Sequence, residues 1–264
     1  MIIGSIRSFW KTAAMEAASI VGEDSLFIVQ FVFRFVRVVV LLAVWRVILE
    51  GKGEASGMTI EAVLTYTLIA EVFAEQLSPR TDIEWSLHDG GIATRFLQPS
   101  SLVAQFMALM FGRWWFGSAL FSTPLLLVAP LLGVNPLPVS ITAAGLFVIS
   151  LLLTILVGVA IEFIFAALMT QLEGSAYVVA RVRTAVSLLL SGALIPLAMM
   201  PWGLGDILRW LPFASVASAP LQIYTGTGDP LALIALQVGW SLILWALAQW
   251  LWRVNREKLA SYGG

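Results

Sequence analysis

The sequence contains no cysteine, a single histidine and few charged residues. Only 12% of its 264 residues are Asp, Glu, Lys or Arg, whereas a soluble domain has about 25%. The missing thiols exclude disulfides, thiol catalysis and cysteine-ligated metals. His88 has no second histidine with which to build a zinc site. The shortage of charge indicates that much of the chain is not in contact with water.

Motifs that would give the chain chemistry of its own are also absent. Gly51-Lys52 lacks both the upstream glycine and the following Ser or Thr of a phosphate-binding loop, and no G-x-S-x-G nucleophile motif occurs. Asp82, Glu84 and Asp89 could orient His88 as a general base, but a solvated histidine in a polar loop explains the same residues. We therefore predict that the protein is not an enzyme and has no catalytic residue, metal site or directly bound cofactor.

Apolar residues dominate what is present. They make up 59% of the chain, and the mean hydropathy is +0.92. A membrane-spanning helix needs about 20 predominantly apolar residues, and the 11 tryptophans suit the membrane interfaces. We predict an all-α membrane protein, a single transmembrane domain over 1–264 with six spans and no cleavable signal peptide. The predicted spans are 26–49, 60–77, 102–132, 141–170, 184–200 and 231–252.

The N-terminal segment, residues 1–25, precedes the first span. Such a segment lies in the plane of the membrane interface when it forms an amphipathic helix. A polar lead-in without membrane contact is the alternative, although Phe9 and Trp10 argue against it. We predict a helix over 3–21 with one face made of Ile3, Ile6, Trp10, Ala13, Ala14 and Ala17.

Basic residues are divided unevenly between the two sides of this topology. Six spans place both termini on one side, and that side holds nine basic residues against three on the other, with three more inside spans. Loops rich in Lys and Arg face the cytoplasm. Both termini and the polar stretch 78–101 are therefore predicted to be cytoplasmic, and the segment 201–226 extracytoplasmic.

Six charged residues fall inside the predicted spans, where an ionisable group costs roughly a few kcal/mol or more. Three are basic, three are acidic, and all six lie in the cytoplasmic half of the predicted topology. A ring of ion pairs that neutralise one another is our first interpretation, and a polar inner vestibule or a proton relay are the alternatives. The six are Arg34, Arg37, Glu71, Glu75, Arg113 and Glu162.

The stretch from Ser187 to Gly226 begins as a span and is then broken repeatedly. Its apolar pieces are too short to cross a bilayer, and broken backbone at membrane depth is tolerated only where protein or a water-filled cavity covers it. We predict short re-entrant helices over 201–226 that guard the outer end of a path. Packing without gating is the alternative. The breaks fall at Pro196, Pro201, Gly203, Gly205, Pro212 and Pro220.

Three stretches together resemble a known family. They are the broken stretch SGALIPLAMMPWGLGDILRWLPFASVASAPLQIYTG, the polar element WSLHDGGIATRFLQPSS, and the loop GKGEASGMTIEAVLTY that leads into the second span. With the N-terminal helix and the six spans, they resemble the permease subunit of a type-2 ATP-binding-cassette (ABC) exporter. The resemblance is to the bacterial branch in which permease and ATPase are separate chains, and it covers nearly the whole sequence.

The resemblance implies a dimer of two permeases, identical or homologous, in the bacterial cytoplasmic membrane. A cassette ATPase would dock on the cytoplasmic side and bind ATP and Mg²⁺, membrane lipid would surround the dimer, and no nucleic acid is involved. Residues 1–25 would be the connecting helix. The coupling element, 78–101, would contact the ATPase through Asp82, Glu84, Trp85, His88, Asp89 and Arg95, and Pro201, Trp202, Pro212 and Phe213 would form the outer gate.

The residues of the coupling element agree with that role. Aromatic and arginine side chains are the usual anchors of an interface, and Gly90-Gly91 supplies a bend. A solvated loop is the alternative. We predict a permease that moves an amphiphilic or hydrophobic substrate outward, driven by its partner ATPase. An ion-gradient-driven secondary transporter or a membrane scaffold without transport activity is the alternative function.

Overall fold

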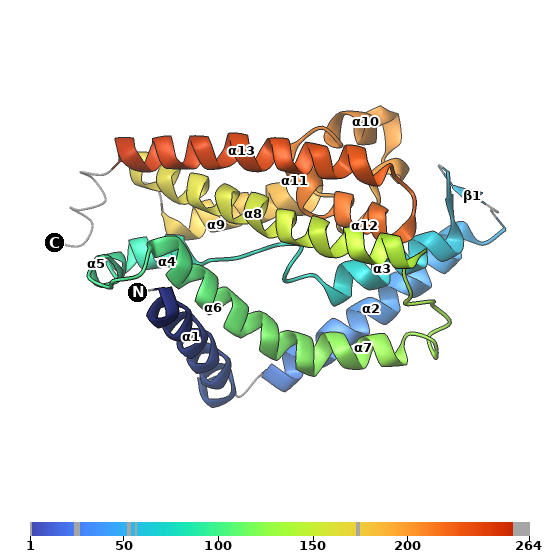
Figure 1. Ribbon diagram of the computed structural model, residues 1–264. Coiled ribbons are helices and arrows are strands. Elements are labelled where there is room, and N and C mark those ends of the chain that lie inside the picture. Colours follow the sequence, from blue (N-terminus) through green and yellow to red (C-terminus); the bar gives the residue numbers. More distant parts are fainter. Residues whose placement is uncertain (1, 24–26, 52–53, 56, 173–174, 256–264) are drawn as a thin grey trace.

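The computed structural model describes residues 2–23, 27–51, 54–55, 57–172 and 175–255. Most of these residues are helical, as predicted. Met1, the basic tail 256–264 and parts of three connections, at 24–26, at 52–53 with 56, and at 173–174, lie outside the described residues. The longer helices are α1 (Ile2–Glu23), α2 (Phe27–Leu49), α3 (Ile60–Val72), α6 (Leu102–Gly117), α8 (Ile141–Leu172), α9 (Ala176–Leu190) and α13 (Pro230–Val254). Of these, α8 and α13 run side by side along the length of the bundle (Figure 1).

Three of these helices are long and apolar enough to cross a membrane. They cover Ile28–Leu49, Ile141–Thr170 and Pro230–Val254, and they correspond to the first, fourth and sixth predicted spans. Each exceeds the roughly 20 residues that a bilayer requires. The predicted boundaries are close to the observed ones because uninterrupted apolar runs determine both.

The predicted third span, 102–132, is an interrupted helix. After α6 the chain makes a π-helical segment, Ser118–Ser122, and continues as α7 (Thr123–Val128). Pro124 has no N–H to donate to the preceding turn, so a regular α-helix cannot continue through it. The Ser122 hydroxyl donates to the Val72 carbonyl at 2.6 Å, which fastens this irregular turn to the end of α3.

The predicted second span is shorter than expected, because α3 ends at Val72 rather than continuing to Leu77. It begins at an N-cap in which the Thr59 side chain accepts from the backbone N–H of Ala62. At its other end, Arg34 donates to the Glu71 carbonyl at 2.9 Å and Ser122 donates to the Val72 carbonyl. Neighbouring side chains thus satisfy carbonyls that a longer helix would have bonded itself.

The predicted fifth span, 184–200, is displaced toward the N-terminus, since α9 covers Ala176–Leu190. Gly192, with φ of +75°, lies just beyond its end and turns the chain. Two 3-10 turns, Leu197–Met199 and Pro201–Gly203, follow. The short helices predicted over 201–226 are present as α10 (Leu204–Leu208), α11 (Pro212–Val216) and α12 (Ser218–Thr225).

The remaining short elements mark the two ends of the bundle. At one end lie α4 (Ile83–His88), α5 (Ile92–Phe96) and the end of α13; at the other lie α10 and a two-stranded antiparallel pairing of β1 (Glu54–Ala55) with β2 (Met58–Thr59) (Figure 1). We call these the α4 end and the α10 end. The sequence did not predict the small strand pairing, because its residues look like an ordinary Gly-rich loop.

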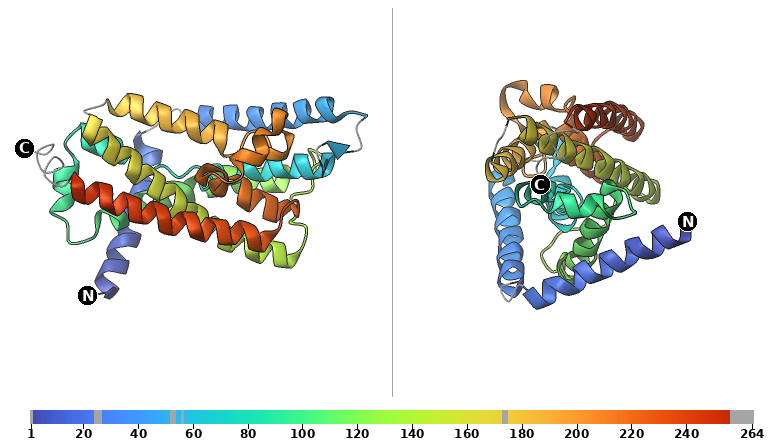
Figure 2. Two further views of the ribbon diagram at one scale, coloured as in Figure 1. Left: turned by 90° about the horizontal axis from the view of Figure 1, so that it is seen from above. Right: turned by 90° about the vertical axis from the view of Figure 1, so that its left-hand side faces the viewer.

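Helix α1 lies across the bundle axis and packs on α6 (Figure 2). Ala13 is buried at the crossing, where a Cβ on Gly112 would stand 2.3 Å from the Ala13 carbonyl oxygen. The predicted helix is confirmed, but only part of its predicted apolar face packs on the protein. Of that face, Ala13 is buried against α6, whereas Trp10 is 61% exposed. The side chains of Ile3 and Ile6 lie outside the described part of the chain. Phe9, which is not in the predicted face, also packs on α6.

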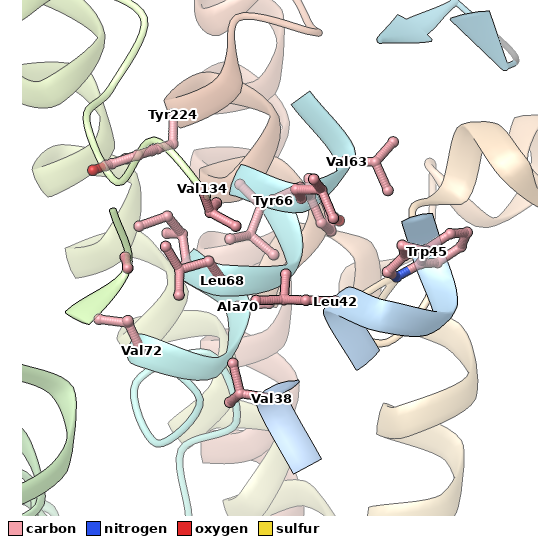
Figure 3. Close-up of a cluster of buried hydrophobic side chains, with 14 of the residues drawn as sticks. Val38, Leu42, Trp45, Val63, Tyr66, Leu68, Ala70, Val72, Val134 and Tyr224 are labelled. Carbon is pink, nitrogen blue, oxygen red and sulfur yellow. The ribbon is translucent and has the colours of Figure 1, made fainter. Parts of the chain in front are cut away.

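The core is divided into clusters along the axis. One cluster joins α2, α3 and α12 and includes Leu42, Tyr66, Leu68 and Tyr224 (Figure 3). A second, nearer the α4 end, joins α4 to α6 and α8 through the fully buried Ile83 and Leu87, among others. The coupling element is therefore part of the folded bundle, with its apolar side chains in a core.

Polar side chains of α13 bind backbone carbonyls of α8 at regular intervals. Trp245 donates to Leu156 at 3.1 Å, and Trp252 and Asn255 donate to Phe163 and Ala167 at 2.8 Å and 2.7 Å. Buried Gln237 extends the series: it accepts from the Ser150 hydroxyl and donates to the Ser215 carbonyl of α11. These bonds fix α13 along the length of α8.

Candidate functional site

The coupling element folds as two short helices with a glycine turn between them. Gly90 has φ of +75°, which favours glycine, and the Asp89 carboxylate accepts from the Gly91 N–H at 2.9 Å. The bend predicted at Gly90-Gly91 is thus present. The turn folds α5 back, so that the chain enters α6 at the Ser101 N-cap.

The two faces of this element differ in exposure. Its inner face, with Ile83, Leu87 and Ile92, is fully buried. Its outer face presents a mixed apolar and charged surface, as a docking surface does. The exposed side chains include Trp85, His88, Asp89, Phe96 and Leu97.

Three of the six predicted contact residues therefore point outward, and three do not. Trp85, His88 and Asp89 are exposed. Arg95 is partly buried, with its guanidinium 4.7 Å from the centre of the Phe106 ring. Asp82 and Glu84 pair with arginines of the bundle, so their carboxylates are bonded within the chain itself. Only 2% of Glu84 is exposed, so this residue does not lie on the outer face of the element, and its predicted contact with a partner stays a prediction.

The buried Glu84 carboxylate belongs to a cluster of three charges from three helices. Arg183 of α9 donates to it at 3.0 Å and also forms an ion pair with Glu162 of α8. The other oxygen of Glu162 accepts from the Thr81 N–H and hydroxyl at 2.9 Å and 3.0 Å. We call Glu84, Glu162 and Arg183 the buried triad. It joins the coupling element to two long helices.

The charge balance of the triad makes it sensitive to change. Two carboxylates share one guanidinium, and all three side chains are at most 7% exposed. Desolvation of buried ions costs several kcal/mol, and only well-placed partners and hydrogen bonds offset it. Displacing α4 relative to α8 and α9 would separate these charges. The conformation of the coupling element and that of the bundle are therefore energetically linked.

The remaining charges inside the predicted spans pair, but not in a closed ring. Arg34 lies 3.1 Å from Glu75, and Arg37 pairs with Glu71, which joins α2 to the end of α3. Arg113 instead pairs with Asp82 and lies 4.0 Å from Glu16 of α1.

The predicted mutual neutralisation of the six charges is therefore present only in part. Arg113 and Glu162 each pair with a residue outside the six, because the polar segments at the α4 end fold against α6 and α8. Sequence reasoning missed Arg183 by placing it in the polar link before the fifth span. Its spacing with Ser187 and Ser191, four and eight residues on, is the polar stripe that could have indicated its helical position.

Two cavities lie beside α3. The smaller, about 180 Å³, includes Glu71, Glu162, Arg183 and Phe213 in its lining. The larger, about 540 Å³, is toward the α10 end and has mixed apolar and polar walls formed by Tyr66, Leu197, Trp210, Gln222, Leu233 and others. Between them, the Tyr66 hydroxyl donates to the Gly192 carbonyl at 2.8 Å. The larger cavity is in the size range of ligand sites, about 300–1,000 Å³.

The residues predicted for an outer gate are not gathered at one place. Trp202 has φ of +58° and is 91% exposed, so it projects from the surface. Phe213 lines the smaller cavity. Pro201, Trp202 and Pro212 are in the lining of neither cavity. Among the described residues, no three acidic or histidine side chains are grouped so that they could hold a metal ion.

The long apolar helices of the described residues are those of a multi-pass membrane protein, and a polar element is anchored at one end of the bundle. The chain belongs to the ABC-2 transporter family: residues 35–263 match the family described as "ABC-2 family transporter protein". This match confirms the resemblance to type-2 ABC permeases. No curated protein matches the sequence at a significant level.

Proposed function

We propose that this chain is the membrane permease of an ATP-driven exporter with a separate cassette ATPase. Family membership supports an ABC-type permease. The observation that supports coupling to an ATPase is the two-faced coupling element, exposed through Trp85, His88 and Asp89 and bonded inward through Glu84 to Arg183. ATP binding and hydrolysis would act on the outer face, and the buried triad would transmit the displacement to α8 and α9.

In this proposal the permease has six spans and works as a dimer in the bacterial cytoplasmic membrane. The α4 end faces the cytoplasm, and α10, α11 and α12 cover the path at the opposite side. ATP-dependent states would expose that path alternately, because each nucleotide state favours the conformation to which the ATPase binds better. The larger cavity supports an amphiphilic cargo, since apolar Leu197 and Leu233 stand in its walls with polar Gln222.

Co-purification tests the coupling step directly. We expect a cassette ATPase, expressed from the same source, to purify with the wild-type chain and to be lost when Trp85 and Asp89 are both changed to Ala. A double variant at exposed residues of the α10 end, Trp202→Ala with Asp206→Ala, should keep the ATPase. Transport by the purified chain under an ion gradient alone would contradict the proposal and favour a secondary transporter.

The absence of cysteine offers a clean test of orientation. Single cysteines placed at Asp89 and at Asp229 should react with a membrane-impermeant thiol reagent from opposite sides of the membrane. We expect the Asp89→Cys variant to be labelled only in inverted vesicles and the Asp229→Cys variant only in intact cells. The reverse labelling would contradict a cytoplasmic coupling element.

A further inference from the structure

Helix α1 has a second face that the bundle leaves uncovered. Phe9 packs on Phe111 of α6, with ring centres 5.8 Å apart, and Ala13 is buried on Gly112. On the other side, exposed residues recur at intervals of three and four, which places them in one line along the helix. This strip consists of Arg7, Trp10, Lys11, Ala14 and Ala18.

The strip combines an exposed aromatic ring with two free cations. Trp10 is 61% exposed, and Arg7 and Lys11 flank it on the same face. Within the described part of the chain, neither cation has an ion-pair partner. The charged residue on the packed side, Glu16, lies 4.0 Å from Arg113 instead. The strip is therefore a basic surface with an indole at its centre.

Helix α1 packs partway along α6 and lies near the coupling element, because Arg113 of α6 contacts both Glu16 of α1 and Asp82. It crosses α6 at Gly112, ten residues after the start of α6 at Leu102, which is about 15 Å along the helix at 1.5 Å per residue. Seen from the α4 end, α1 forms an outer edge of the molecule (Figure 2). Because the spans run along the bundle axis, a helix lying across that axis at its periphery lies in the plane of the membrane.

We propose that the strip of Arg7, Trp10 and Lys11 binds anionic phospholipid headgroups of the membrane leaflet at the α4 end. Tryptophan is enriched at the level of the headgroups, and basic side chains on an interfacial helix attract anionic lipid. Each cation near such a surface increases the local preference for anionic over zwitterionic lipid about fivefold. The interaction requires no ATPase, so it can be tested whether or not the proposed function holds.

The test uses the full chain in bilayers that contain phosphatidylcholine and a minority of phosphatidylglycerol. Two samples have the same ratio of the two lipids. In one, the phosphatidylglycerol is brominated, and in the other the phosphatidylcholine is brominated, because bromine quenches tryptophan fluorescence. The difference between wild type and Trp10→Phe isolates the signal of Trp10 from that of the other tryptophans. We expect brominated phosphatidylglycerol to quench Trp10 several-fold more than its share of the bilayer predicts. Quenching in proportion to its share would overturn the proposal.

A charge-removing variant supplies the second arm. The double change Arg7→Gln with Lys11→Gln should abolish the excess quenching, since both sites are exposed and their loss leaves the packing on α6 intact. The matched control removes two other exposed cations near the same end, Arg181→Gln with Arg253→Gln, and should retain the excess. Equal loss in both variants would overturn a specific role for α1. So would loss of a co-purified ATPase from the α1 variant, because the strip would then contact the ATPase.

Discussion

The Glu84 carboxylate and the Arg183 guanidinium lie 3.0 Å apart in the interior, although 99 residues separate them in the chain. Glu84 comes from the coupling element and Arg183 from α9, and Glu162 of α8 pairs with the same guanidinium. One arginine thus determines how three segments are held together. The buried triad thus connects α4, whose other side is exposed, to the long helices.

Removing the guanidinium should be far more harmful than removing one carboxylate. Arg183→Gln would leave two buried carboxylates without their cation, and breaking a buried ion pair from one side costs about 3–5 kcal/mol. We expect a large drop in the melting temperature of the detergent-purified chain. Glu84→Gln should be milder, because the amide oxygen can still accept from Arg183.

The neighbouring exposed arginine provides the control for this experiment. Arg181 lies two residues earlier on α9, exposed, with its guanidinium 4.8 Å from the centre of the Tyr177 ring. Arg181→Gln should leave the melting temperature close to that of wild type. If Arg181→Gln and Arg183→Gln lower it equally, the triad does not stabilise the fold.

Charge reversal should distinguish the true partner of Glu71. The structure pairs it with Arg37, so Glu71→Arg should be rescued by Arg37→Glu and not by Arg113→Glu, whose partners are Asp82 and Glu16. The readout is the amount of folded protein extracted from membranes. Rescue by Arg113→Glu instead would show that the ion pairs at the α4 end are arranged differently.

Two glycine substitutions should have opposite effects. A Cβ at Gly112 would stand 2.3 Å from the Ala13 carbonyl oxygen, a backbone atom that cannot rotate away, whereas a Cβ at Gly239 of α13 meets nothing within 4 Å. We expect Gly112→Ala to displace α1 and lower stability. Gly239→Ala should raise stability by about 0.5–1 kcal/mol through helix propensity. Thermal unfolding measures both, and a neutral Gly112→Ala would contradict the close packing of α1 on α6.

Replacing the buried amide between α8, α11 and α13 should be costly. Gln237→Leu would leave Ser150 and the Ser215 carbonyl without the bonds they now make to Gln237, at roughly 1–3 kcal/mol for each buried group left unsatisfied. Gln222, which is half-buried and donates to Ser218 within its own helix, is the matched control. A smaller loss for Gln237→Leu than for Gln222→Leu would contradict this assignment.

The long helices could be predicted because the length of an apolar run determines them directly. The ends of α3 and α9 could not, since tertiary contacts fix them: Arg34 and Ser122 bind carbonyls at the end of α3. The π-helical turn before Pro124 has the same origin. Six spans were predicted, and three of them correspond to helices long and apolar enough to cross a membrane.

In the coupling element, too, some features could be predicted from the sequence and others could not. Its glycine bend follows from residue type, since Gly90 adopts a positive φ. The inward direction of Glu84 does not, because α4 has only six residues and so few positions give no reliable periodicity. Arg183 was missed because the start of α9 lies in a polar stretch. In both cases the missing information was the partner residue, which is distant in sequence.

The bonds from Trp245, Trp252 and Asn255 of α13 to carbonyls of α8 restrict how this molecule can change shape. Sliding one helix past the other by a single turn would break all three at once, so we expect these two helices to travel as one stiff unit. Rearrangement during a working cycle then has to occur where they meet α3 and α9. A pair of spectroscopic labels, one on α8 and one on α3 or α9, should therefore report a changing distance. The distance between two labels placed on α8 and α13 should stay constant.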